Sequence, residues 1–313
     1  MDREKILLLG ASSKLAQAIV RLLKAETDYK LFISSGNEYF VSYVKNEKIY
    51  SLDPFNIKEV KSLCLEIKPN VIINSLGYSD IELCEKDKKI AWDLNAGIVS
   101  NLVSICKVLE THLITFSTDN IYDGEKGPYT DDSKPNPINN FGKTKLAAEN
   151  VCTSTLERST ILRLTPFFGW AGFDKHDFVT QCLIKLMNKE QLTEPNWRYS
   201  NPVFIDDVAA AVVKILQKKL YGAFNNGGGE YISKYQAART IAKVYGFDES
   251  LIQSEESPSN IKKDKIPRKA GLITLKTETE LGIKPTLFEN AIITARYQKN
   301  ISSKYMSSKH GLL

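Results

Sequence analysis

The chain has 313 residues, of which 42% are hydrophobic and 25% charged, so it can bury a large core and does not resemble a disordered protein. Its net charge of +5 comes from interleaved basic and acidic residues, which suits an anionic ligand better than nucleic acid. Because no secretory leader or membrane-length apolar run stands out, we expect a soluble cytoplasmic protein. The five scattered cysteines and three histidines form no metal-ligand pattern, so no metal site is predicted.

Apolar runs alternate with amphipathic stretches through the first half of the chain. Strands are expected at 5–10, 30–34, 71–74, 112–117 and 160–164, and helices at 15–23, 56–67, 90–109 and 143–156. This alternation indicates right-handed βαβ units. The predicted fold class is therefore α/β, with a Rossmann-type doubly wound parallel sheet.

The alternation weakens after residue 165. Further helices are expected at 206–218 and at 234–245, the latter between Ser233 as N-cap and Gly246 just after its end. We expect a Rossmann domain in 1–165, a smaller substrate lobe in 166–295 that packs discontinuously on it, and a tail in 296–313. The cleft between the two parts would receive a second ligand.

The turn after the first strand is similar to a dinucleotide-binding glycine loop. Gly10 takes the first glycine position, whereas Ser13 and Ala16 take the second and third. Small residues let a pyrophosphate reach the amides of the helix N-terminus, and serine hydroxyls can add hydrogen bonds. The cofactor contacts expected here are Gly10, Ser12, Ser13, Lys14 and Leu15. An ordinary βα turn is the alternative.

The end of the second strand bears on the choice of dinucleotide. Residues 33–36 contain no carboxylate to repel the 2′-phosphate of NADP, and Ser34 can donate a hydrogen bond to that phosphate. No arginine stands nearby, and Lys14 is the best local cation. The cofactor is therefore expected to be NADP or NAD, with NADP slightly favoured.

Several motifs occur in the order typical of extended short-chain dehydrogenases. They are Asp53-Pro54, 69–77, the segment 117–124 (STDNIYDG) and 140–149, followed by 201–209 and 266–272. Together they make residues 4 to 295 resemble the dTDP-4-dehydrorhamnose reductase family, which reduces a 4-keto nucleotide sugar with NAD(P)H. The resemblance implies a nicotinamide cofactor and a nucleotide-sugar substrate.

The resemblance also implies roles for single residues. Asp53 would lie near the adenine, Ser75, Leu76, Gly77 and Ser117 would contact the cofactor, Lys145 would hold the nicotinamide ribose, Thr118 would bond the substrate carbonyl, and Asp119, Asn120 and Pro166 would lie near the sugar. Alone, Ser117-Thr118 can equally cap a turn, and Lys145 can be a solvated helix residue. Their joint order favours the pocket.

Three positions depart from the family pattern. Phe141 stands where the family has a tyrosine, four residues before Lys145 and on the same helix face. Ser13 replaces a glycine, and Pro166 stands where the reductases usually have a tryptophan. A general acid contributes about 10²–10⁴ in rate, so residual activity through Thr118, Lys145 or a water is compatible with the loss of the phenol.

Three functions therefore remain open. The first is an NAD(P)H-dependent reductase of a nucleotide-linked 4-keto-deoxy sugar, with activity impaired or altered by Phe141. The second is a catalytically silent NAD(P)-binding regulatory or scaffold protein, of the kind represented by the regulatory β-subunit of methionine adenosyltransferase in the same branch. The third is a sugar-nucleotide epimerase or dehydratase, for which Asp119-Asn120 is a partial match. A homodimer or a regulatory protein partner is the expected assembly.

Overall fold

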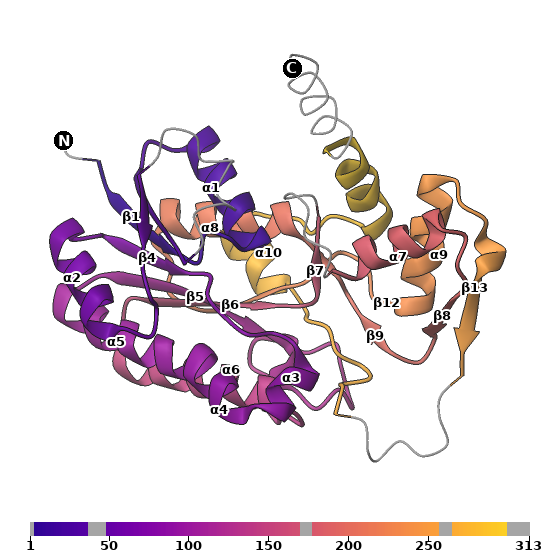
Figure 1. The fold of residues 1–313 in the computed structure, drawn as a ribbon, viewed down its shortest axis with the longest axis horizontal. Helices are drawn as coiled ribbons and strands as arrows, with labels where there is room; N and C mark the ends of the chain where they lie inside the picture. Colours follow the sequence, from indigo (N-terminus) through magenta and orange to yellow (C-terminus); the bar gives the residue numbers. More distant parts are fainter. Residues whose placement is uncertain (1–2, 37–47, 170–176, 257–264, 299–313) are drawn as a thin grey trace.

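The computed structural model describes residues 3–36, 48–169, 177–256 and 265–298. Its centre is a seven-stranded parallel sheet with the order β11-β6-β5-β4-β1-β2-β3 (Figure 1). The strands are β1 (Lys5–Leu9), β2 (Lys30–Ser35), β3 (Ile49–Ser51), β4 (Val71–Asn74), β5 (His112–Thr118), β6 (Ser159–Leu164) and β11 (Gly222–Asn226). Because the order reverses between β1 and β4, this is the doubly wound sheet predicted from the sequence.

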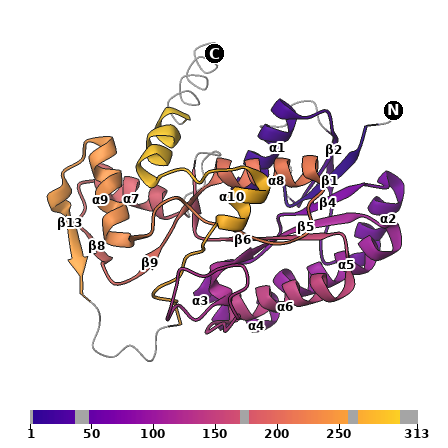
Figure 2. The same ribbon diagram turned by 180° about the vertical axis from the view of Figure 1, so that it is seen from behind.

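Helices cover both faces of the sheet (Figures 1 and 2). One face carries α1 (Lys14–Glu26), α8 (Ile205–Lys218) and α10 (Leu275–Leu281), and the other carries α2 (Ile57–Ile67), α5 (Ile98–Leu109) and α6 (Asn140–Thr155). Successive side chains of a strand point to opposite faces, so Ile6 and Leu8 enter the first core and Leu7 and Leu9 the second. Burial on both faces explains why these strands are continuous apolar runs.

The sheet also contains a segment from late in the chain. β11 pairs with β6 from Gly222 opposite Thr160 to Asn226 opposite Leu164. α8 packs against α1, and α10 packs against α8 and β11. Residues 205–226 and 275–281 therefore belong to the layers of the first lobe, although they lie beyond the sequence division at residue 165.

The second lobe has its own apolar core. This core is built from α7 (Phe178–Met187), α9 (Lys234–Tyr245), a helix over 288–298, and the parallel pair β8 (Leu192–Pro195) and β13 (Ile252–Glu255). Two short pairs complete the structure: β7 (Phe167–Phe168) with β10 (Val203–Phe204), and β9 (Tyr199–Ser200) with β12 (Ile232–Ser233). No helix in the described ranges is long and apolar enough to cross a membrane.

The helix expected at 90–109 is not uniform. It consists of α4 (Lys88–Trp92), a π-helical segment (Asp93–Gly97) and α5, and it follows the short helix α3 (Ile81–Lys86). Such π-helical turns are rare and occur frequently at functional sites. This one places the buried Asn95 at the carboxyl end of the sheet, where its amide bonds the chain after β4.

Candidate active site

The glycine loop is closed by a network of short contacts between β1 and β4. Gly10 has a φ of +84°, and a Cβ there would lie 2.9 Å from Ser75 Oγ, so the position requires glycine. Ser75 Oγ donates to Leu9 O at 2.6 Å and to Gly10 O at 2.9 Å. Leu76 also packs against Gly10. These contacts therefore hold the glycine loop against the end of β4.

Ser13 caps α1 in place of the expected glycine. Its Oγ accepts a hydrogen bond from Ala16 N at 3.1 Å and lies 3.4 Å from Ser75 Oγ. The hydroxyl thus takes one of the helix N-terminal amides that an approaching phosphate could use. Ser12 is exposed and Leu15 is buried.

Two residues that were expected to contact the cofactor, Lys14 and Asp53, are already engaged by other groups. The Lys14 ammonium is paired with the Asp177 carboxylate, which belongs to the second lobe. Ser34 is buried, and its carbonyl accepts from Ala11 N at 3.0 Å. Asp53 is exposed in the turn after β3, where its Oδ1 accepts from Phe55 N at 2.9 Å.

Lys145 reaches from α6 to the ends of β4 and β5. Its Nζ donates to Phe116 O at 3.0 Å, and a Cβ on Gly77 would lie 3.1 Å from that nitrogen. Burial lowers the pKa of the Lys145 ammonium to about 8, although Cys84 and Glu149 oppose the shift. Lys145 is therefore a cationic acid whose pKa lies near neutrality, not a solvated surface residue.

Phe141 lies on the same helix and packs into an apolar cluster. Its neighbours there are Cys84, Ala91, Tyr78 and Ile81. Burial, and then the nearby carboxylates Asp80 and Asp87, raise the pKa of Tyr78. Its hydroxyl is consequently a weaker acid than an ordinary phenol. Tyr78 is thus a poor substitute for a phenol at position 141.

Thr118 ends β5 and is followed by two polar residues that orient it. Its Oγ1 accepts from Asn120 N and from Asn120 Nδ2, each at 3.2 Å, and donates to Asp119 Oδ1 at 3.3 Å. Ser117 is also buried, and its hydroxyl has no hydrogen-bond partner among the described residues. A ligand would satisfy this hydroxyl, because buried polar groups are almost always paired.

Asp119 joins the two lobes and does not face an open cleft. The carboxylate is 1% exposed, and its Oδ2 accepts from Gly271 N at 3.2 Å and from Ser200 Oγ at 3.4 Å. Burial raises its pKa to about 6, and these hydrogen bonds oppose that shift. Pro166 is exposed, and its carbonyl accepts from Val203 N.

Two residues that the sequence did not single out hold α6 in place. Asn139 caps the helix through Gly142 N at 2.7 Å and also donates to Asn120 Oδ1 at 3.0 Å. A Cβ on Gly142 would lie 2.0 Å from Asn120 O, so the helix can approach Asn120 only with glycine there. The pair Asn139-Asn140 before an amphipathic stretch was the available signal for this cap.

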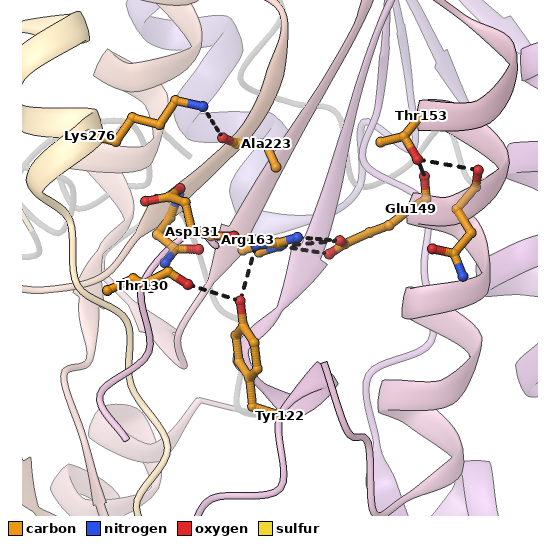
Figure 3. Close-up of polar contacts among 10 residues, drawn as sticks. Tyr122, Thr130, Asp131, Glu149, Thr153, Arg163, Ala223 and Lys276 are labelled. Atoms are coloured by element: carbon orange, nitrogen blue, oxygen red, sulfur yellow. Dashed lines mark hydrogen bonds and ion pairs between the residues drawn. The ribbon is translucent and has the colours of Figure 1, made fainter. Parts of the chain in front are cut away.

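A third unpredicted feature is a buried charge network behind α6 (Figure 3). Arg163 on β6 donates to both carboxylate oxygens of Glu149 at 2.8–3.2 Å and to Tyr122 Oη at 3.0 Å. It also donates to Asp131 O at 2.8 Å. The network fixes α6 to the loop that follows Asn120. An arginine in an apolar strand, STILRL, was the signal for it.

The described residues contain no group of three or more His, Cys, Asp or Glu side chains that could hold a metal ion. All five cysteines are free and buried. The site is instead built from the carboxyl ends of β1, β4 and β5 and from the facing residues of α6. Ligands of doubly wound sheets bind at this position.

The whole length of this architecture matches one family model, RmlD substrate binding domain, over residues 4–299. The chain belongs to the RmlD substrate binding domain family. Methionine adenosyltransferase 2 subunit beta of Rattus norvegicus is 24% identical, over 95% of this chain and 91% of that protein. The dTDP-4-dehydrorhamnose reductase of Aggregatibacter actinomycetemcomitans is 25% identical, over 93% and 98%.

A solved structure has the same fold. The dTDP-4-dehydrorhamnose reductase of Bacillus anthracis in complex with NADP superposes with a TM-score of 0.83, over 95% of this chain and 99% of that one. Its sequence identity is 19%, so the likeness concerns the fold. The family resemblance predicted from the motifs is therefore confirmed. The relatives that the chain resembles include both a reductase and a subunit of another enzyme.

Proposed function

We propose that this protein is an NAD(P)H-dependent reductase of a nucleotide-linked 4-keto-deoxy sugar, in which Lys145 supplies the proton that a family tyrosine would otherwise donate. The observation that carries the proposal is the position of the Lys145 ammonium, 3.0 Å from Phe116 O and beside Gly77. Phe116 lies two residues before Thr118 on β5. The cation, the hydroxyl and the open end of β4 therefore lie on neighbouring elements.

The pocket residues fit a nicotinamide dinucleotide. Gly10 turns the chain into the N-terminus of α1, and Gly77 is exposed beside Lys145. The buried Ser117 hydroxyl has no partner within the described part of the chain. Ser13 and Lys14 make the fit weaker, because their polar groups are engaged. Residues 33–36 contain no carboxylate, so we propose NADP or NAD with NADP slightly favoured. The NADP complex of the Bacillus anthracis relative supports this proposal.

The proposed reaction uses two side chains of this chain, Thr118 and Lys145. A bound reduced nicotinamide supplies the hydride. Thr118 Oγ1 turns its proton from Asp119 toward the ketone oxygen and polarises it. Lys145 holds the nicotinamide ribose and donates a proton, directly or through a water, to the developing alkoxide. At neutral pH most of the ammonium is available, because its pKa is about 8.

For the nucleotide-sugar substrate, we propose that Asn120 and Pro166 border the sugar, while Asp119 positions Asn120. Asn120 Nδ2 donates to Asp119 Oδ1 at 3.0 Å, and the other Asp119 oxygen is engaged by the second lobe. A carboxylate bonded in this way offers no free acid to a dehydration step. The arrangement therefore favours reduction over dehydratase chemistry.

A second candidate is a catalytically silent dinucleotide-binding protein that regulates a partner. The packing of Phe141 into an apolar cluster favours it, since the ring is fully used in the fold and no phenol takes its place. The similarity to a methionine adenosyltransferase subunit supports this candidate as well. Such a protein would act through a protein partner or as a homodimer.

The deciding experiment is an assay of NADPH and NADH oxidation with dTDP-linked 4-keto-6-deoxy sugars. Phe141→Tyr should raise the rate by at least about tenfold, because a general acid contributes about 10²–10⁴. Tyr78→Phe is the matched control and should leave the rate unchanged. If Phe141→Tyr binds cofactor and remains inert with every sugar, the reductase proposal fails and the regulatory one stands.

A further inference from the structure

One ion pair crosses between the two lobes at the proposed cofactor site. Lys14 is the first residue of α1, and its ammonium pairs with Asp177, the N-cap of α7. The two side chains are 4% and 9% exposed, so water screens their attraction little. α1 contributes to the apolar core on one face of the central sheet, whereas α7 contributes to the apolar core of the second lobe.

Asp177 is held firmly on the α7 side. Its Oδ1 accepts from Thr180 N at 2.7 Å, and its Oδ2 accepts from Thr180 Oγ1 at 3.1 Å. The carboxylate therefore stays with α7 if the pair opens. Arg21 and Asp206 form a contrasting ion pair, which is more exposed (52% and 25%) and joins α1 to α8.

The charge of Lys14 matters because of its place in the glycine loop. Lys14 is the only basic residue in the segment 10–16, and the N-terminus of α1 is where this fold receives a phosphate. In the structure, Asp177 has already neutralised that charge. An incoming pyrophosphate would meet both the helix N-terminus and a competing carboxylate.

We infer that Asp177 is a built-in competitor for the cofactor phosphate, and that the Lys14–Asp177 pair couples dinucleotide binding to the docking of α7. The inference rests on the proposed cofactor site. Binding of the pyrophosphate draws Lys14 away from Asp177 and removes this tie between the lobes. The docking of α7 in the second lobe therefore depends on whether the dinucleotide is bound.

Calorimetric titration of Asp177→Asn with NADPH and NADH tests the competition. Asparagine keeps the helix cap but removes the negative charge, so the affinity should rise at least about fivefold over that of the unmodified protein. Asp206→Asn is the matched control, and its affinity should stay within about twofold. Equal or weaker binding by Asp177→Asn overturns the inference.

Hydrogen exchange of the cofactor-free protein tests whether the Lys14–Asp177 pair stabilises α7. Lys14→Met keeps the length of the side chain but leaves Asp177 unpaired, so amides of α7 should exchange faster than in the unmodified protein. Unchanged exchange overturns the coupling. A protein that binds no dinucleotide in any variant refutes the cofactor site and the inference with it, whereas binding that is insensitive to Asp177→Asn refutes the inference alone.

Discussion

Phe141 and Lys145 lie one turn apart on the same face of α6, and both side chains are buried. The Phe141 ring packs against Cys84, Ala91, Tyr78 and Ile81, while the Lys145 ammonium reaches the backbone of β5. Of these two side chains, only Lys145 therefore carries a group that can donate a proton. If the site reduces a ketone, the proton must come from this lysine, from Thr118 or from water.

The rate of the proposed reaction should depend on the protonation of Lys145. Its lowered pKa of about 8 means that the ammonium is lost as pH rises through that value, so kcat should be level from about pH 6 to 7.5 and fall above about 8. Lys145→Arg keeps the charge at all these pH values and should abolish the inflection. An inflection that persists in Lys145→Arg would assign it to another group.

Gly142 should be required for the approach of α6 to Asn120. Gly142→Ala places a Cβ 2.0 Å from Asn120 O, so we expect a loss of about 2 kcal/mol in the free energy of unfolding and a lower reductase rate. Gly97→Ala is the control, because its Cβ would meet nothing closer than 3.8 Å. The control should be neutral or stabilising by up to about 1 kcal/mol. Equal urea midpoints for the two variants would refute this account.

Glu149 should contribute strongly to stability through Arg163. Glu149→Gln leaves a buried guanidinium without its countercharge, which costs about 3 kcal/mol in the free energy of unfolding. Glu289→Gln removes the partner of Lys243 in a pair that is 65% and 46% exposed, and should cost less than about 1 kcal/mol. Because Glu149 also raises the pKa of Lys145, its removal should shift the alkaline fall in rate to lower pH.

His112 should make the protein less stable in mild acid. Burial, and then the charge of Arg158, lower the pKa of His112 to about 4, and its Nε2 lies 2.7 Å from Thr160 Oγ1. The unfolded chain takes up this proton near pH 6.5, but the folded chain does so only near pH 4. Stability is therefore lost as pH falls through this window.

Urea unfolding of the unmodified protein and of His112→Gln isolates this effect. From pH 6.5 to 5 the unmodified protein should lose about 2 kcal/mol more than the variant. The buried Asp119, with its raised pKa of about 6, acts in the opposite direction, but it is common to both proteins and cancels in the comparison. Parallel pH profiles would show that His112 does not carry the dependence.

The regular half of the fold was predictable because buried parallel strands are continuous apolar runs, as in Lys5–Leu9 and Val71–Asn74. β11 was not, since its sequence GAFNN is not a continuous apolar run, and its place depends on pairing with β6. The π-helical turn at Asn95 leaves the helical periodicity of 90–109 almost unchanged. The hydrophobic periodicity of the sequence therefore could not predict this turn.

The candidate site was predictable as a set of positions but not as a set of contacts. Gly10, Thr118 and Lys145 lie at the ends of strands or on the facing helix, where their motifs placed them. The pairing of Lys14 with Asp177 joins residues 163 positions apart, so no local pattern could indicate it. The same holds for the burial of Asp119 against the second lobe.

The most direct test of the reductase proposal follows the hydrogen that is transferred. Phe141→Tyr is incubated with NADPH or NADH deuterated at C4 of the nicotinamide and with a dTDP-linked 4-keto-6-deoxy sugar, and the product is analysed by mass spectrometry. One deuterium is expected on the former carbonyl carbon, with a slower transfer by the unmodified protein. Bound cofactor with no label in any sugar would contradict the proposal.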